Sequence, residues 1–370
     1  MPKGIFNDSQ KMEIEKVNNQ ELIYKLNKEH SLSIEEWEQL LSTYTKEDLE
    51  CATKLAQEIA VKVFGKSVYF RGIIEFSNFC KCDCYYCGIR KSNKECQRYR
   101  LTLSDIMECC QEGYENGFRT FVLQGGEDGW FTDEKVCEMV KTIKETYPDC
   151  AVTLSLGEKS YESYKLFKEA GADRYLLRHE TADAEHFGVL HPKKQTLKSR
   201  MQCLKDLKSL GYQTGCGIMV GTPGQTPAII AKDMKFMEEF QPEMIGVGPF
   251  LPHKDTPFKD KEKGSTELTL LILALCRIML PEVLLPATTA LGTVETDGRK
   301  QGVLAGCNVV MPNLSPISVR KKYMLYDEKA GTEISAAEGI ALLSKQMEEI
   351  GYEVKVGRGD ARLKPSLVTT

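Results

Sequence analysis

The sequence predicts an α/β fold, a (β/α)8 TIM barrel with additional N-terminal helices. Eight short runs rich in Val, Ile, Leu and Phe alternate with segments whose apolar residues recur at helical spacing. Most of these runs are apolar throughout, as expected for parallel strands that helices cover. Eight strand–helix repeats are typical of a TIM barrel. A doubly wound open sheet has the same order of elements, so the order alone does not show closure.

Caps and breakers mark the helices between the strands. One helix is expected to begin at the N-cap Ser104 and to stop at Gly117, and two others end at Pro148 and Gly211. The strands are expected at residues 67–78, 118–126, 151–158, 174–180, 213–221, 244–250, 284–292 and 307–313.

Helices are also expected on either side of the barrel. Ser33 and Glu36 have the spacing of a capping box, and Trp37 begins an apolar face that continues at residues 40 and 41. The last segment predicts one closing helix and a polar end. The expected division is a helical extension at 1–66, the barrel at 67–334, and a C-terminal helix and tail packed on the barrel at 335–370.

Composition narrows the classes of function. The formal net charge is −4, and no block of Lys and Arg indicates a partner that is nucleic acid or an anionic membrane. No run approaches the roughly 18 apolar residues of a membrane span. The polar start, "MPKGIFNDSQKMEIEK", lacks the apolar core of a signal peptide. The chain is therefore expected in the cytoplasm, where clustered cysteines are more often metal ligands or catalytic thiols than disulfides.

Unusual polar residues follow the expected strands at their C-terminal ends, where barrel enzymes carry their active sites. Polar groups there cost stability unless they bind something. The sequence therefore predicts a site at this end of the barrel. The stretches are "CKCDCYYC", "GGED", "RHET", "GTPGQT", "PFLPHKDTP", "ATTA" and "MPNLSP".

Four of the 14 cysteines lie within eight residues, after the first strand. Cys80, Cys84 and Cys87 form a CxxxCxxC set, with Cys82 as an intervening residue. A structural zinc site uses four ligands, often in two CxxC pairs, and the sequence has no second pair. A ferredoxin-type cluster also uses four cysteines. Three thiolates would leave one metal position open, as catalytic sites do.

This spacing, in a loop after the first barrel strand, resembles that of the radical S-adenosylmethionine (SAM) superfamily. The resemblance implies that Cys80, Cys84 and Cys87 are the catalytic residues and the metal ligands of one 4Fe-4S cluster, with Cys82 a bystander. It implies that the amine and carboxylate of SAM bind the fourth iron. Reductive cleavage of SAM would then give a 5′-deoxyadenosyl radical.

The resemblance also implies a set of SAM-binding residues. Arg178 and Glu180 alternate with His179, so both are expected to point into the barrel. Arg200 is expected to bind a carboxylate. Each assignment has a structural alternative: a core tyrosine, a tight turn or a solvated arginine. The expected set is Tyr86, Gln124, Gly125, Gly126, Glu127, Ser155, Arg178, Glu180 and Arg200.

Within the superfamily, residues from about 67 to 326 resemble the HydE family of FeFe-hydrogenase maturases, through stretches such as "CGIR", "RHETAD" and "PATTA". The resemblance implies a small cysteine-ligated iron carbonyl/cyanide substrate, and contacts with other maturases and an electron donor. The last cysteine is Cys307, so ligands for a second cluster near 326–339 are lacking. Tyr323 and Tyr326 are expected on one helical face. The expected substrate-binding residues are Arg71, Thr288, Thr289, Met311, Tyr323 and Tyr326.

Other functions fit part of the pattern. A methylornithine synthase or a biotin-synthase-like enzyme would keep the cluster and SAM, although the second cluster of biotin synthase needs further ligands, for which Cys216 and Cys307 are the main candidates. A non-enzymatic iron–sulfur scaffold would bind no SAM and would leave Arg178 and Glu180 unexplained.

Overall fold

The computed structural model describes residues 18–361. Residues 1–17 of the expected helical extension, including the polar start, and residues 362–370 of the expected tail lie outside the described residues.

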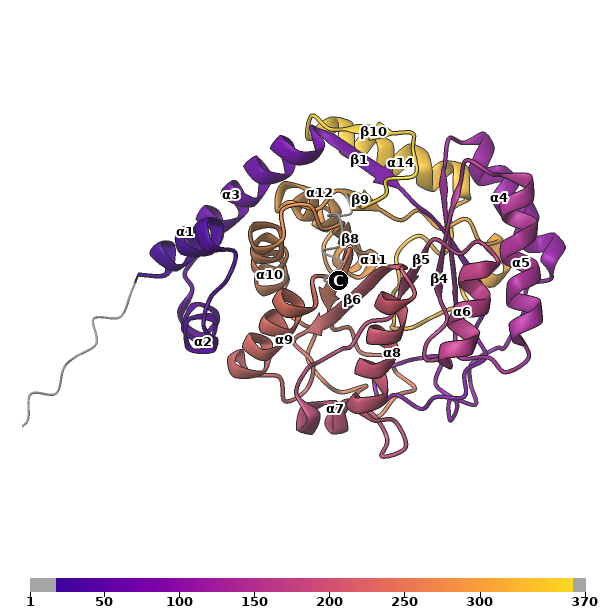
Figure 1. Ribbon diagram of the computed structural model, residues 1–370, viewed down its shortest axis with the longest axis horizontal. Coiled ribbons are helices and arrows are strands. Elements are labelled where there is room, and N and C mark those ends of the chain that lie inside the picture. The colour runs from indigo at the N-terminus through magenta and orange to yellow at the C-terminus, as the bar shows by residue number, and fades with distance from the viewer. Residues whose placement is uncertain (1–17, 362–370) are drawn as a thin grey trace, which may run out of the picture.

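All strand pairs are parallel and fall into two sheets (Figure 1). Isolated β-bridges join both edge strands of the six-stranded sheet to the four-stranded sheet. Met244 of β7 pairs with Leu284, just before β8, and Ile73 of β2 pairs with Asn313, just after β9. The ring of strands that begins at β2 therefore closes on β2 again. This arrangement confirms the α/β barrel prediction and disfavours an open doubly wound sheet. The six-stranded sheet runs β2 (Gly72–Ser77), β3 (Thr120–Gly125), β4 (Ala151–Ser155), β5 (Arg174–Leu176), β6 (Gln213–Val220) and β7 (Met244–Pro249). The four-stranded sheet runs β10 (Glu353–Lys355), β1 (Ser67–Phe70), β9 (Val309–Val310) and β8 (Pro286–Ala287).

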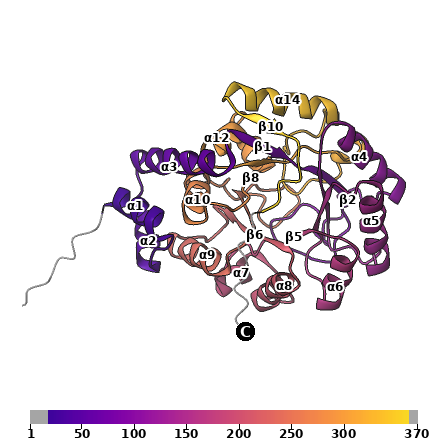
Figure 2. The same ribbon diagram turned by 45° about the horizontal axis from the view of Figure 1, so that its top comes forward.

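Helices surround the strands in both ribbon views (Figures 1 and 2). The expected N-cap at Ser104 is wrong: Thr102 caps α4, because Asp105 completes a capping box with it. The barrel helices are α4 (Leu103–Glu115), α5 (Asp133–Thr146), α6 (Tyr161–Glu169), α7 (Ala184–Leu190), α8 (Leu197–Ser209), α9 (Pro227–Phe240), α10 (Thr266–Met279), α11 (Thr289–Val294), α12 (Gly298–Leu304) and α13 (Ile317–Arg320).

Three helices precede the barrel, α1 (Asn19–Glu29), α2 (Ile34–Thr43) and α3 (Lys46–Phe64), and α14 (Ala336–Glu349) follows it. The capping box of Ser33 and Glu36 is present, and Trp37 is fully buried. α2 packs on α9 and α3 packs on α10. The expected domain division stays a prediction.

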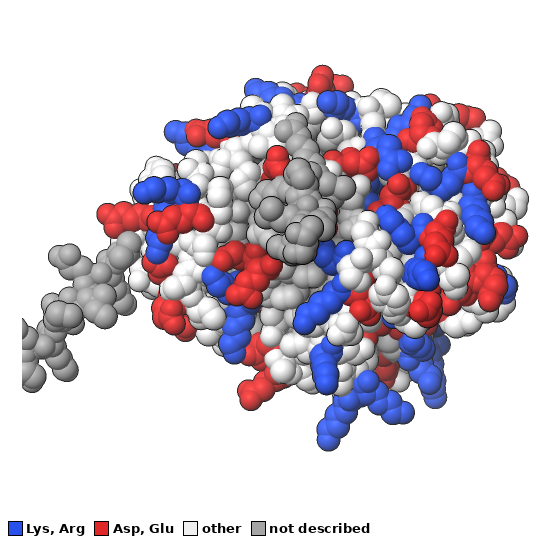
Figure 3. Space-filling model, in the orientation of Figure 1, with Lys and Arg blue, Asp and Glu red and all other residues white. Residues whose placement is uncertain are grey.

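Charged side chains of both signs are interspersed over most of the face in Figure 3. Within residues 18–361, no helix combines the length and apolar character that crossing a membrane requires.

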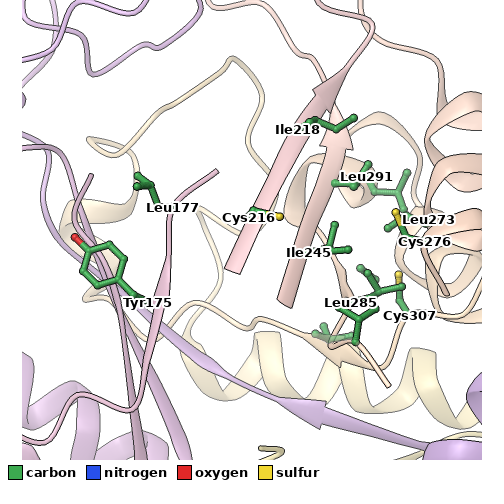
Figure 4. Packing of buried hydrophobic residues seen from close by; sticks show 14 of the residues in the cluster. Tyr175, Leu177, Cys216, Ile218, Ile245, Leu273, Cys276, Leu285, Leu291 and Cys307 are labelled. Atoms are coloured by element: carbon green, nitrogen blue, oxygen red, sulfur yellow. The ribbon is translucent and has the colours of Figure 1, made fainter. Parts of the chain in front are cut away.

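Buried apolar side chains fill the space between the strands and the outer helices (Figure 4). Cys216, Cys276 and Cys307 are buried there as free thiols, beside Ile245 and Leu291. The side chain of Cys216 lies toward Cys276. These cysteines therefore contribute to the core as small apolar groups.

Several expected strands are shorter than the pattern suggested, among them β5, β8 and β9. β5 ends at Leu176, and Glu180 has the left-handed backbone angle φ +65°. β8 has two residues, because the hydroxyl of Thr288 caps α11 by accepting a hydrogen bond from Leu291. The "ATTA" stretch thus forms a strand end and a helix start.

Candidate active site

The four clustered cysteines lie in the loop that follows β2, all of them half-buried and unpaired. The loop folds back on itself, because the Lys91 amide donates to the Cys82 carbonyl at 2.8 Å and the Cys87 amide to the Cys84 carbonyl at 3.4 Å. The Gly88 amide donates to the Leu325 carbonyl at 2.9 Å, which fixes the loop to the segment after β9.

The four thiols differ in their surroundings. The Cys82 thiol hydrogen-bonds to Cys80 and lowers the pKa of Cys80 to about 7. Burial raises the pKa of Cys84 to about 11 and that of Cys87 well above its ordinary value. Among residues 18–361, no three Cys, His, Asp or Glu groups are arranged around a single metal ion. Thiols whose pKa values are raised in this way suit a bound metal cluster, whose positive iron favours the thiolate form.

The Gly125–Gly126–Glu127 turn at the end of β3 contacts the cysteine loop. A Cβ on Gly126 would lie 2.2 Å from the Phe79 carbonyl oxygen and 2.8 Å from the Cys80 Cβ, so only glycine fits. The Glu127 amide donates to the Cys80 sulfur at 3.4 Å. The Glu127 carboxylate pairs with Lys81 at 3.1 Å and accepts from the Glu158 amide at 3.0 Å.

Arg178 and Glu180 lie on the same side of the chain, as expected from their alternation with His179. Their side chains pair at 2.9 Å, whereas the fully buried His179 faces Asp233 at 3.7 Å. The second carboxylate oxygen of Glu180, Oε2, is buried and has no hydrogen-bond partner. A buried carboxylate oxygen without a donor is costly, and a ligand hydroxyl or ammonium group would satisfy it.

Arg200 is buried on α8 and is already bound within the protein. Its Nε donates to Glu158 Oε1 at 2.7 Å and its Nη1 to the Arg178 carbonyl at 2.6 Å. Glu158, which the sequence interpretation did not assign, therefore already occupies part of the guanidinium that was expected to bind a carboxylate of SAM. Its signal was the acidic end of "VTLSLGE", directly after β4.

The connection between α7 and α8 supplies two further residues that the sequence interpretation missed. The side-chain amide of Gln195 donates from Nε2 to the Cys84 sulfur at 3.6 Å. The Tyr86 hydroxyl lies 3.2 Å from His191 Nε2, while His191 Nδ1 lies 3.1 Å from the Phe187 carbonyl. A neutral His191 that donates through Nδ1 therefore accepts from Tyr86. Its signal was the polar "HPKKQT" stretch.

Most of the expected substrate residues lie in the barrel interior or beside it. Thr289 and Met311 line a cavity of about 220 Å³ that also contains Glu75, Lys329 and Arg299. Lys329 forms an ion pair with Glu75, and the Arg299 side chain has no ion pair with any residue in 18–361. The Oγ1 atom of Thr288 approaches Gly248 on β7.

Three other expected residues lie apart from this cavity or in a different backbone setting. Tyr323 is fully buried, and its hydroxyl accepts from Gln124 at 3.3 Å. The expected helix that carries Tyr323 and Tyr326 is wrong: α13 ends at Arg320 and turns follow, because the Lys322 carbonyl accepts from the Asn78 side chain. Ser155 ends β4 beside Gln124.

Arg71 lies at the opposite end of the barrel from the cysteines. It donates to Met244, the first residue of β7, at 3.1 Å and to the Gly359 carbonyl at 3.1 Å. Its guanidinium is buried, and burial lowers the pKa of Arg71 well below its ordinary value. Arg71 lines a small cavity with Met311, so the structure brings it beside one expected substrate residue but not to the cysteine loop.

The chain matches the radical SAM superfamily over residues 74–237. It is 45% identical, over 82% of its length and 86% of the relative, to the FeFe hydrogenase maturase subunit HydE of Thermotoga maritima. It is 30% identical to the 3-methylornithine synthase of Methanosarcina acetivorans, over 87% of its length and 90% of the relative. The crystal structure of methylornithine synthase PylB matches with a TM-score of 0.80 at 27% identity, covering 90% of this chain and 97% of that one. The maturase HydG shares the fold, with a TM-score of 0.76 at 19% identity, over 91% of this chain and 76% of that one.

The parallel barrel, the cysteine loop at its C-terminal end and these matches define a SAM-dependent enzyme of the radical SAM superfamily. Within that superfamily, the chain belongs to the HydE family. The superfamily implies a 4Fe-4S cluster and SAM as cofactors. The buried thiols, the close approach at Gly126 and the unpartnered Glu180 oxygen fit both cofactors.

Proposed function

We propose that this enzyme reductively cleaves SAM and acts on a small cysteine-ligated iron carbonyl/cyanide complex during maturation of the FeFe-hydrogenase active site. The observation that carries the SAM step is the buried, unpartnered Glu180 oxygen at the barrel end that holds the cysteines. The relative that is 45% identical supports the maturation role. A scaffold without SAM would leave the Glu180 carboxylate unsatisfied.

The proposed cluster ligands are Cys80, Cys84 and Cys87. Cys82 is proposed to be a neighbour of the cluster and not a ligand, and its thiol forms a hydrogen bond with the Cys80 thiol. When bound, the cluster supplies one electron to the sulfonium of SAM, whose carbon–sulfur bond breaks to give methionine and the 5′-deoxyadenosyl radical. Gly126 lets the cysteine loop pack against the end of β3, and the Glu127 backbone amide and the Gln195 side-chain amide donate to the ligand sulfurs.

Glu180 and its neighbours are proposed to orient SAM. Arg178 holds Oε1 of the Glu180 carboxylate, so Oε2 stays available to accept a hydrogen bond from the amine or a ribose hydroxyl of SAM. Arg200 and Glu158 hold the backbone of Arg178 in place. Tyr86, which His191 fixes, is proposed to shield the cluster beside the adenine. Gln124, Gly125 and Ser155 are proposed to complete the pocket.

The cavity beside the lumen supports an anionic substrate. Lys329 neutralises Glu75, which leaves the charges of Arg299 and Arg320 in the cavity lining. Thr288 and Thr289 are proposed to donate to cyanide or carboxylate ligands, and Met311 to pack against the complex. Tyr323 and Tyr326 are proposed to flank it, and Arg71 to act from the far end of the lumen.

Compartment and partners are also proposals. All 14 cysteines are free thiols, which favours a reducing compartment such as the cytoplasm. Contacts with other maturases and with an electron donor follow from the proposed role. Methylornithine synthesis is the second candidate, because the structural match extends over 97% of the PylB chain.

Anaerobic reconstitution tests the SAM step and the ligand set together. We expect a reduced 4Fe-4S electron paramagnetic resonance signal that shifts when SAM is added, with 5′-deoxyadenosine as product. Cys80→Ala, Cys84→Ala and Cys87→Ala should each lose the signal, whereas the matched variant Cys82→Ala should keep it. Loss of the cluster in Cys82→Ala would show that the ligand set is wrong. A reconstituted cluster without any response to SAM would refute the enzymatic proposal.

The substrate is tested separately. The enzyme should release 5′-deoxyadenosine faster in the presence of the cysteine-ligated iron complex than in its absence. No acceleration by the complex, together with formation of 3-methylornithine in cells that express the enzyme, would favour methylornithine synthesis.

A further inference from the structure

Two loops around the cysteines carry exposed lysines, which we call the basic rim. Apart from Lys81, which pairs with Glu127, none of them forms an ion pair with any residue in 18–361. The basic rim consists of Lys81, Lys91 and Lys94 in the cysteine loop and Lys193, Lys194 and Lys198 at the start of α8 and just before it.

The basic rim has a charge opposite to that of the whole chain. Residues 81–94 carry a net charge of +3 and residues 192–198 carry +3, whereas the chain has a net charge of −4. Basic side chains project together from the lower edge of Figure 3, the edge where α7 and α8 lie in Figure 1. Unpaired charges of one sign create a local field that attracts an opposite surface.

Both lysine-bearing loops contact the cysteines directly. The Lys91 amide donates to the Cys82 carbonyl at 2.8 Å, and Gln195, next to Lys194, contacts the Cys84 sulfur at 3.6 Å. The Tyr85 amide donates to the Leu190 carbonyl at 3.0 Å and joins the two loops. The basic rim is therefore the protein surface adjacent to the proposed cluster.

Exposed apolar side chains adjoin the same loops. Trp130, in the loop after β3, is 47% exposed, and its neighbour Glu127 pairs with Lys81. Val189 is 45% exposed and immediately precedes Leu190. Aromatic and apolar groups bordered by charges are typical of protein interfaces.

We propose that the basic rim docks an acidic one-electron carrier protein that reduces the cluster. This inference rests on the proposed function, because each SAM cleavage consumes one electron that must reach the cluster from outside. In the step, the carrier is oxidised by one electron and the cluster is reduced by one. Opposite charges speed the encounter, and the effect falls as salt rises.

The test measures the reduction of the reconstituted enzyme by a reduced plant-type ferredoxin in stopped flow. Lys193→Glu with Lys194→Glu should lower the second-order rate about tenfold or more at low salt and flatten its dependence on salt. Reduction by dithionite should not change, because dithionite needs no docking surface. The matched control carries Lys54→Glu and Lys62→Glu, two exposed lysines on α3, and should behave as the wild type.

Equal ferredoxin rates in the rim variant and the wild type would overturn the proposal, and so would an equal loss in the α3 control. If the rim variant fails to hold its cluster, Lys91→Glu with Lys94→Glu tests the same surface from the other loop. Failure of the proposed function has a different signature. Dithionite-reduced wild-type enzyme would then release no 5′-deoxyadenosine, whatever the ferredoxin rates are.

Discussion

At the scale of single residues, the site depends on groups that leave room as well as on groups that bind. Gly126 lies where any side chain would overlap the Phe79 carbonyl, and Glu180 adopts a backbone angle that few residues other than glycine adopt. Both lie at the C-terminal end of the barrel. Local strain that persists at such a position is consistent with a functional requirement.

Gly126→Ala should prevent assembly of the cluster. The added methyl would approach the Phe79 carbonyl to 2.2 Å, so the cysteine loop would have to move away from β3. Iron content and the absorbance of the reconstituted protein measure the loss. Gly129→Ala is the matched control, because a Cβ there meets no atom within 4 Å. Equal iron content in the two variants would contradict this role of Gly126.

The sequence indicated the residues of the site better than it indicated their partners. The spacing of the cysteines and the alternation around His179 are local properties, so they could be interpreted directly. Glu158, His191 and Gln195 could not be assigned, because their partners Arg200, Tyr86 and Cys84 are 42, 105 and 111 positions away. Only the folded barrel brings such pairs together.

At the scale of elements, the connection between α7 and α8 forms one wall of the cysteine site. His191 is buried at its start, stacks on Phe187 at 4.0 Å between ring centroids, and accepts from Tyr86. Burial lowers the pKa of His191 to about 3. The folded protein therefore holds this imidazole neutral at any pH above that value.

His191 should make the fold sensitive to acid. The unfolded chain binds a proton at this residue below about pH 6.5, whereas the folded chain does not until about pH 3, so stability falls as pH falls between these values. From pH 7 to pH 5 the expected loss is about 2 kcal/mol. Urea denaturation at both pH values measures it. His191→Gln should lose about 2 kcal/mol less over the same interval, and an equal loss would contradict the assignment.

Element types could be predicted where periodicity was long, but not where a cap or a tertiary contact ended the element. The apolar run at 284–292 predicted one long strand, yet the Thr288 hydroxyl begins a helix within it. The three-residue spacing of Tyr323 and Tyr326 suited a helix, but the contact between Asn78 and the Lys322 carbonyl holds that segment in turns. A polar side chain from a distant loop outweighed the local pattern.

At the scale of the whole molecule, the C-terminal segment covers the N-terminal end of the barrel. The Arg174 side chain is fully buried and pairs with Asp360 at 2.6 Å. Arg71 donates to the Gly359 carbonyl at 3.1 Å, and Thr120 donates to the Arg358 carbonyl at 2.8 Å. Arg71, between β1 and β2, and Arg174, on β5, thus depend on residues 358–360 for their partners.

Asp360→Ala should destabilise the protein by about 2–3 kcal/mol, because Arg174 would keep a buried charge without its carboxylate. Equilibrium denaturation by urea at neutral pH gives the value. Asp260→Ala removes an exposed carboxylate elsewhere and should change the stability by less than about 0.5 kcal/mol. If both variants unfold at the same urea concentration, the carboxylate does not stabilise Arg174.

The sequence predicted the barrel because each strand–helix unit carries its own pattern. It could not predict β10 or its pairing, since Ser67 and Glu353 are partners across almost the whole chain. Three residues of mixed polarity at a sheet edge give no periodic signal.

The contacts at residues 353–360 also set the order in which parts of the chain can fold during translation. β1 leaves the ribosome long before its partner strand β10 and the residues that cover the barrel end. Pairing between such distant segments forms late, because the intervening chain must first be ordered. A nascent chain that has not yet exposed residues 353–360 would therefore hold its cysteine loop complete while the opposite end of the barrel is still uncovered.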